Sequence, residues 1–138
     1  MTPTALAGLH ARVFTTPRPW SEPEFAALLS DPTVFLIAEP AGFLLGRAVA
    51  GEAEILTLAV APEARRQGSG ARLVAAFLTQ AAARGAETAF LEVACDNLAA
   101  VALYQAAGFA RAGQRRGYFT TPEGTRLDAL VMTRAVLG

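Results

Sequence analysis

The feature that most constrains the fold is an apolar run followed by a loop of arginines and glycines and then by a helical pattern. The run is Glu54–Ala61, and the loop contains Arg65-Arg66-Gln67-Gly68-Ser69-Gly70-Ala71. The helical pattern covers about 69–84, stops at Gly85, and is followed by a second apolar run, Thr88–Ala94. This order predicts a right-handed βαβ unit with two parallel strands. The helix then begins at the carboxyl ends of the strands, where open α/β sheets bind ligands.

The segment before this unit predicts two helices and a meander of strands. Helical spacing covers about 4–15, and a capping box at Ser21 begins the second helix. Thr33–Ala38 and Phe43–Ala50 are typical of antiparallel strands, and Gly51 permits the reversal into the strand at 54–61.

The segment after the unit predicts one more helix and a hairpin. The helix covers about 97–107, with Asp96 or Asn97 as N-cap and Gly108 just past its end. Phe109–Gly117 and Arg126–Ala135 form the hairpin around the loop Thr120–Gly124. The whole order is ααβββαβαββ, an α/β fold with a mixed central sheet of about six to seven strands and helices on both sides.

Length and composition exclude several classes of protein. A chain of 138 residues with 53% hydrophobic and 17% charged side chains predicts one globular domain over 1–138. All basic residues are arginine, and His10 and Cys95 are the single residues of their types, which leaves too few ligands for an ordinary zinc site and no disulfide. Zero net charge argues against nucleic-acid binding through a broad basic face. No apolar stretch approaches the roughly 20 residues of a membrane span, so we expect a cytoplasmic protein that binds no membrane.

The glycine-containing loop favours binding of a pyrophosphate. Gly68 and Gly70 let the backbone come close to a ligand, and the free N–H groups and dipole of the helix start attract an anion. Arg65 and Arg66 add positive charge. Ordinary loop structure explains a short Gly-x-Gly equally well, and the third glycine of a dinucleotide fingerprint is missing.

Two side chains in the second half are candidates for acid–base chemistry. Glu92 is a carboxylate among apolar neighbours in a central strand, which is costly unless the group is paired or functional. Tyr104 lies in the following helix. The alternatives are an arginine ion pair for Glu92 and a core ring for Tyr104. Cys95 is better explained as a small buried residue than as a nucleophile, and His10 as a structural residue.

The string from Glu54 to Phe109 resembles the GCN5-related N-acetyltransferase (GNAT) superfamily. The resemblance is carried by Arg65–Ala71, by Asn97 and by Ala102-Leu103-Tyr104 followed by Gly108-Phe109. Within the superfamily the chain is most similar to the bacterial ribosomal-protein-alanine N-acetyltransferases of the RimI type. Segments that add to this subfamily likeness are Arg18-Pro19-Trp20-Ser21-Glu22, Leu91-Glu92-Val93, Gln114-Arg115-Arg116-Gly117-Tyr118-Phe119 and Leu127-Asp128-Ala129.

This resemblance implies that strands 54–61 and 88–94 splay apart and hold acetyl-CoA as cosubstrate, with no metal. It implies that Glu92 is the general base and Tyr104 the general acid. It places the pantetheine arm and thioester carbonyl at the backbone of Leu58, Ala59 and Val60, with Asn97 near the pantetheine. It assigns the pyrophosphate to Arg66, Gln67, Gly68, Ser69, Gly70 and Ala71.

The function implied is acetyl transfer to an amine, with the N-terminal alanine of a ribosomal protein as the expected acceptor. An α-amino group has a pKa of about 8 and needs less help to lose its proton than a lysine does. We expect direct transfer in a ternary complex. The alternatives are a GNAT enzyme that acetylates a small-molecule amine, a non-catalytic acyl-CoA-binding module and, from another class, a nucleotide-binding βαβ module.

Overall fold

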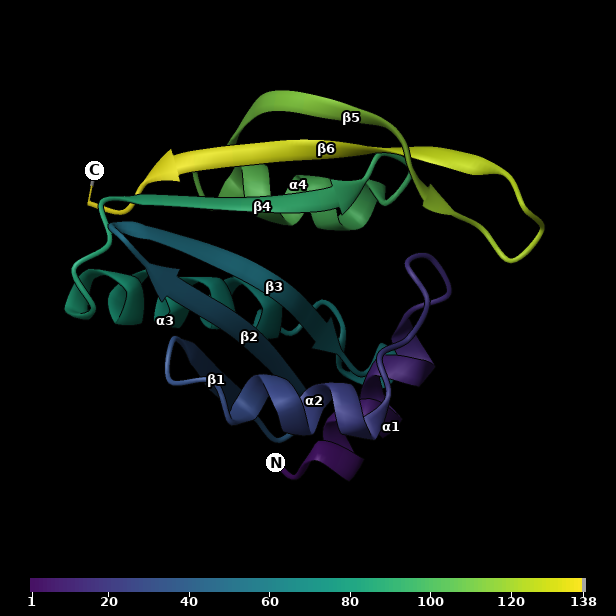
Figure 1. Cartoon of the computed structure of the whole chain (residues 1–138), viewed down its shortest axis with the longest axis horizontal. Helices are drawn as coiled ribbons and strands as arrows, with labels where there is room; N and C mark the ends of the chain where they lie inside the picture. Colours follow the sequence, from purple (N-terminus) through teal and green to yellow (C-terminus); the bar gives the residue numbers. More distant parts are fainter. Residues whose placement is uncertain (138) are drawn as a thin grey trace.

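The computed structural model describes residues 1–137 and contains one six-stranded mixed sheet with helices on both faces (Figure 1). In chain order the elements are α1 (Pro3–Val13), α2 (Glu22–Leu29), β1 (Val34–Glu39), β2 (Gly42–Val49), β3 (Glu52–Val60), the 3-10 turn η1 (Pro62–Ala64), α3 (Ser69–Ala83), β4 (Thr88–Ala94), α4 (Leu98–Ala106), β5 (Ala110–Thr120) and β6 (Arg126–Ala135). The predicted order and fold class are confirmed.

The strands lie in the order β1-β2-β3-β4-β6-β5, and β3 and β4 run parallel at the centre. All other neighbouring pairs are antiparallel. The crossover through α3 joins the parallel pair, which confirms the predicted βαβ unit. The sheet therefore consists of two antiparallel halves that meet at one parallel seam.

Two apolar clusters fill the two sides of the sheet. One joins Phe77 of α3 and Tyr104 of α4 to strand residues such as Leu91. The other joins Leu6 of α1 and Phe25 of α2 to Phe43 of β2. Figure 1 shows α1 and α2 together on the side away from α3. The seam between β3 and β4 is thus reached by different helices on its two faces.

The helix ends follow the local signals in the sequence. The Ser21 hydroxyl and the Glu24 carboxylate form the predicted capping box of α2. Asn97, and not Asp96, caps α4, since its side chain accepts a hydrogen bond from the backbone N–H of Ala100. Gly108 follows α4 with a φ of +93°, a conformation that glycine adopts without strain.

Three predicted boundaries are wrong by two residues or more. The strand predicted from Glu54 begins at Glu52, because Glu52 already pairs with Val49 of β2 and Thr88 of β4. The first helix ends at Val13 and not at 15, because Phe14 is extended at the C-cap and the Pro17 and Pro19 segment cannot continue a helix. The strand predicted to end at Gly117 runs to Thr120. Gly117 has a φ of +58° and donates its N–H to Asp128 Oδ1, so it lies in an irregular part of the strand instead of ending it.

The seam opens after a short stretch of pairing. The last paired residues are Ile55 and Leu91, although β3 continues beside β2 to Val60. Thr57 pairs with Leu45 and Ile55 with Gly46, so Leu56 is an extra residue on β3, which is a β-bulge. The bulge turns the side chains that follow it to the opposite faces, and β3 diverges from β4 beyond it (Figure 1).

Among residues 1–137, none of the helices is sufficiently long and apolar to span a bilayer.

Candidate active site

A cavity of about 1110 Å³ lies where β3 and β4 diverge. Its walls come from α1 and the loop after it, from both diverging strands, from the start of α3, from α4 and from the end of β5. The β4-facing edge of β3 beyond Ile55 borders this space. A buried backbone edge without a neighbouring strand needs hydrogen-bond partners, so the cavity is suited to a ligand with amide and carbonyl groups.

The start of α3 forms one end of the cavity and has free backbone donors. Thr2, Ser21 and Asn97 cap α1, α2 and α4 with their side chains, whereas no side chain caps α3 in the described part of the chain. Its N-cap is Gly68, with a φ of +81°. The uncapped N–H groups and the helix dipole make this end a site for an anion.

Arg72 braces the loop that leads into α3. Its guanidinium donates to the Gln67 carbonyl at 2.8 Å, to Ser69 Oγ at 3.0 Å and to Glu39 Oε1 at 2.9 Å. This brace was not identified from the sequence, because nothing in the spacing links Glu39 of β1 to α3. Arg65 and Arg66 line the cavity and add positive charge at the same end.

The two loop glycines have different surroundings. A Cβ on Gly70 would lie 3.0 Å from Leu103 Cδ2, so this glycine permits contact between α3 and α4. A Cβ on Gly68 would meet only the Arg72 guanidinium, at 3.0 Å, but its positive φ disfavours any other residue. Gly70 therefore has a packing role that the sequence did not indicate, in addition to its place on the cavity lining.

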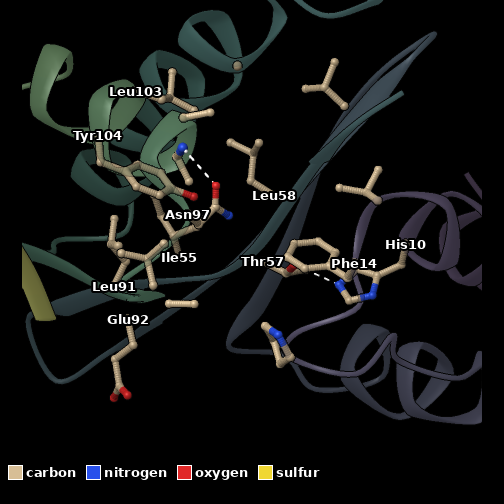
Figure 2. A pocket seen from close by; sticks show the side chains of 18 of the residues that line it. His10, Phe14, Ile55, Thr57, Leu58, Leu91, Glu92, Asn97, Leu103 and Tyr104 are labelled. Carbon is tan, nitrogen blue, oxygen red and sulfur yellow. Dashed lines mark hydrogen bonds between the residues drawn. The ribbon is translucent and has the colours of Figure 1, made fainter. Parts of the chain in front are cut away.

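Tyr104 and Asn97 from α4 face Leu58 of β3 across one part of the cavity (Figure 2). The Tyr104 side chain is 7% exposed, and its ring packs edge-on against Phe109. Burial raises the pKa of the Tyr104 phenol, so the hydroxyl keeps its proton at neutral pH. Tyr104 is therefore a core ring that also brings a protonated hydroxyl to the cavity wall.

Glu92 lies on the opposite side of β4 from Leu91 and points away from Tyr104 (Figure 2). Its Oε1 atom is 3.2 Å from Nη2 of Arg115 on β5. Its Oε2 atom is buried and has no hydrogen-bond partner among the described residues. The ion pair that the sequence left open thus exists, and the second carboxylate oxygen has no hydrogen-bond partner among the described residues.

A second carboxylate, Glu54, also lines the cavity. Burial is the main cause that raises the pKa of Glu54, and the charge of Glu92 adds to it, while Arg47 and Arg115 oppose the shift. The sequence analysis did not identify Glu54 as a site residue, because it is the first residue of the predicted strand and a charged residue is ordinary at that position. A signal was present in the sequence: the two strands of the predicted βαβ unit each contain a glutamate, Glu54 at the start of the first and Glu92 inside the second.

His10 and Thr57 are a further pair on the cavity wall that sequence reasoning did not place there. They are joined by a 3.0 Å hydrogen bond between His10 Nε2 and Thr57 Oγ1. His10 is 1% exposed and stacks on Phe14 and Trp20, so its ring is part of the core beneath the cavity. Burial lowers the pKa of His10 to about 4, so the ring is neutral at neutral pH.

The structure brings most of the predicted site residues to this one cavity. Those on its lining are Leu58, Val60, Arg66, Gly68, Ser69, Gly70, Ala71, Glu92, Asn97 and Tyr104. Ala59 and Gln67 are not on it. The Ala59 side chain is buried among α1 and α2 residues, and the Gln67 carbonyl accepts a hydrogen bond from Arg72 of α3. Cys95 is half-buried and not buried as predicted, because it stands just past the end of β4, and it does not line the cavity.

Comparison with known proteins agrees with this geometry. Residues 7–109 match the model of the acetyltransferase (GNAT) family. The chain belongs to the GNAT acetyltransferase family. Members of this family use acetyl-CoA. The family match, together with the relatives described next, shows that this chain is an N-acetyltransferase.

Individual GNAT proteins resemble the chain over most of its length. The [ribosomal protein bS18]-alanine N-acetyltransferase of Escherichia coli K12 is 37% identical over 118 residues, which are 83% of this chain and 79% of that protein. The N-alpha-acetyltransferase RimI of Mycobacterium tuberculosis is 36% identical over 137 residues, covering 93% and 83%. The crystal structure of the E. coli ribosomal-protein-S18-alanine N-acetyltransferase superimposes with a TM-score of 0.85 at 32% identity, covering 97% and 87%. The predicted RimI-type resemblance is confirmed.

We predict that Glu54→Gln makes this GNAT protein more stable at neutral pH. A carboxyl whose pKa is raised by folding favours the folded state below its ordinary pKa and loses that contribution as pH rises through the raised value. Glutamine carries no charge at any pH, so its melting temperature at pH 7.5 should exceed that of the wild type.

The difference should shrink as the pH falls toward 4.5, measured by thermal denaturation across this range. Glu52→Gln, at the exposed start of the same strand, is the matched control and should leave the melting temperature nearly unchanged. A lower melting temperature of Glu54→Gln at pH 7.5 would show that the attraction of Arg47 and Arg115 outweighs burial.

Proposed function

We propose that the protein transfers the acetyl group of acetyl-CoA to the α-amine of an N-terminal alanine on a ribosomal protein. The observation that carries this proposal is the cavity at the β3–β4 seam, because it unites an uncapped helix start, a carboxylate and a protonated phenol. The acceptor is supported by the relatives of E. coli and M. tuberculosis described above. Ribosomal proteins are made in the cytoplasm, so we propose the cytoplasm as its place of action.

The loop before α3 fits the pyrophosphate of acetyl-CoA. The backbone N–H groups of Ser69, Gly70 and Ala71 have no side-chain cap and lie at the cavity. Arg66, which itself has a φ of +66°, and the Gly68 N-cap shape the turn around Gln67. Two left-handed residues in one short turn direct neighbouring N–H groups to one side, which suits an anion.

The pantetheine arm fits along the edge of β3 that has left β4. The backbone of Leu58, Ala59 and Val60 forms this unpaired edge, and Leu58 and Val60 line the cavity beside it. Asn97 uses Oδ1 to cap α4, which leaves its Nδ2 group as a donor for an amide carbonyl of the arm. Backbone N–H groups of this edge stabilise the oxyanion that forms on the thioester carbonyl.

Glu92 is the proposed general base. An α-ammonium group with a pKa of about 8 loses its proton to the free Glu92 oxygen, directly or through a water. Arg115 holds the other oxygen and fixes the direction of the carboxylate. The neutral amine then forms the new N–C bond with the thioester carbon.

Tyr104 is the proposed general acid on the other side of the seam. As the C–S bond breaks, the phenol gives its proton to the leaving thiolate and recovers one from solvent. Base and acid approach the reacting carbon from different sides of β4, which matches an amine that arrives from one side and a thiolate that departs to the other (Figure 2). No acyl-enzyme is proposed, since Cys95 does not line the cavity.

The acceptor is tested with purified protein, acetyl-CoA and peptides that begin with alanine and contain an internal lysine. Mass spectrometry should locate one acetyl group on the α-amine and none on the lysine. The same peptide with a blocked α-amine should not react. Turnover confined to polyamines or other small amines, tested beside the peptides, would contradict the proposal.

We predict that Gly68→Ala weakens the binding of acetyl-CoA and leaves the protein folded. The substitution forces alanine into a left-handed conformation, which costs about 1–2 kcal/mol. Its methyl group also contacts the Arg72 guanidinium that braces the loop. The KM for acetyl-CoA should rise by about 5–30-fold.

Gly51→Ala is the matched control for this variant. Gly51 has nearly the same φ, +82°, but lies in the β2–β3 turn with no heavy atom within 4 Å of the added methyl. It should lower the melting temperature similarly and leave the KM for acetyl-CoA unchanged. Equal KM values in both variants would remove the loop from the cofactor site.

We predict different pH–rate profiles for Glu92→Gln and Tyr104→Phe. Glu92→Gln should lower kcat/KM by about 10²–10⁴-fold, and the loss should shrink above pH 8 because solvent then deprotonates the amine. The Tyr104→Phe defect should persist at high pH, since a higher pH cannot supply a proton to the thiolate. Melting curves check folding, and parallel pH profiles of the two variants would show that at least one role is wrong.

A further inference from the structure

The Thr57 hydroxyl is a buried polar group on the cavity wall that the proposed chemistry does not use. Thr57 is the first residue after the Leu56 bulge, and it is 8% exposed. The bulge turns its side chain to the face of the sheet covered by α1, whereas Leu58 faces α4. The residues on either side of Thr57 are Leu56 and Leu58, so a bulge at a different position would not bring a hydroxyl to this place.

The hydrogen bonds of His10 settle which atom carries its proton. The backbone N–H of Trp20 donates to His10 Nδ1 at 3.0 Å, so Nδ1 is the acceptor of a neutral ring. The proton of that ring is therefore on Nε2, and Nε2–H donates to Thr57 Oγ1 at 3.0 Å. Stacking on Phe14 and Trp20 holds the ring in this orientation (Figure 2).

Thr57 accepts from His10, so its own O–H group is left as a donor. It has no other hydrogen bond within residues 1–137. A buried hydroxyl without an acceptor is costly, whereas a ligand oxygen at this position relieves that cost. One of the two lone pairs of Thr57 Oγ1 accepts from His10, so the O–H group points away from the imidazole.

The surroundings of Thr57 favour a peptide as the ligand. The cavity wall on this side carries the aromatic side chains of Phe14, Trp20 and Tyr118. Among described lining residues, Glu92 and Glu54 point to this same face of the two strands. An amine held at Glu92 has, in a peptide, a carbonyl oxygen two bonds beyond its Cα carbon, and a simple amine has none.

We propose that Thr57, oriented by His10, donates a hydrogen bond to the carbonyl oxygen of the acceptor's first residue and thereby selects peptides over simple amines. This inference rests on the proposed function, because it assigns a specificity-determining contact at the acceptor side of the same cavity. His10 is a positioning residue that acts through Thr57.

The experiment compares two acceptors in wild type, Thr57→Val and Thr57→Ser. One acceptor is an alanine-initiated peptide, and the other is the same peptide with a trans alkene in place of its first amide, which keeps the shape and removes the carbonyl oxygen together with the amide N–H. The missing N–H affects wild type and variants alike, so the change in the ratio between variants reports on the oxygen. Thr57→Val keeps the volume of threonine without the hydroxyl. It should lower kcat/KM for the amide peptide by about 5–30-fold and leave the alkene analogue and the KM for acetyl-CoA nearly unchanged.

Thr57→Ser should restore most of the preference for the amide, which a merely structural threonine would not do. His10→Phe keeps an aromatic ring and removes the Nε2 donor. It should reduce the amide-to-alkene ratio by a similar factor, and the double variant with Thr57→Val should lose little more. Rates are compared per folded molecule, with melting curves for every variant.

An equal fall on both acceptors in Thr57→Val would overturn the assignment, since the hydroxyl would then address the thioester or the fold. An unchanged amide-to-alkene ratio would overturn it as well. Failure of the wild type to acetylate any alanine-initiated peptide would refute the proposed function itself. The wild type is measured first, so this result is distinguished from a failure of the Thr57 assignment.

Discussion

The divergence of β3 from β4 after the Ile55–Leu91 pair is the constraint on which the rest of the structure depends. Two parallel strands at the centre of a sheet normally satisfy each other's backbone groups, and leaving them unpaired in a buried place is costly. Here β2 holds the outer edge of β3 as far as Val60, and β6 holds β4 as far as Ala94. Each strand is therefore supported from outside while its inner edge is free. The opening is a stable part of the fold because the two antiparallel halves do not need each other beyond the seam.

The bulge at Leu56 sets which side chains face each side of that opening. It reverses the alternation of β3, so that Ile55 and Leu58 both meet the α3 and α4 core, while Thr57 meets His10 of α1. Without the extra residue, the regular alternation of a strand would send Thr57 to the apolar core and Leu58 to α1. The bulge that weakens pairing with β2 therefore places a hydroxyl beside the carboxylates on one side of the opening, while the phenol of Tyr104 and the amide of Asn97 lie on the other.

The sequence was informative where the determinants are local. Turns, caps and strand–helix alternation depend on residues a few positions apart, so Ser21, Asn97 and Gly108 marked element ends, and the loop before α3 marked the βαβ unit. The bulge was not predictable, because it depends on how β3 registers with β2. The His10–Thr57 bond joins residues 47 positions apart, and Glu54 meets Glu92 only through the sheet. The resemblance to a family supplied roles for Glu92 and Tyr104 that composition and spacing alone left open.

Charge in the cavity is arranged locally although the chain as a whole is neutral. Arginines 65 and 66 stand at the end near α3, and two carboxylates stand on the acceptor side with Arg115 attached to one of them. In the proposed reaction, a polyanionic cosubstrate is attracted to the arginine end of the cavity and a cationic amine to the carboxylate end. Because charges of opposite sign stand at the two ends, each ligand is repelled from the end that attracts the other. The order of charges along the cavity therefore favours one orientation of each ligand before a proton is transferred.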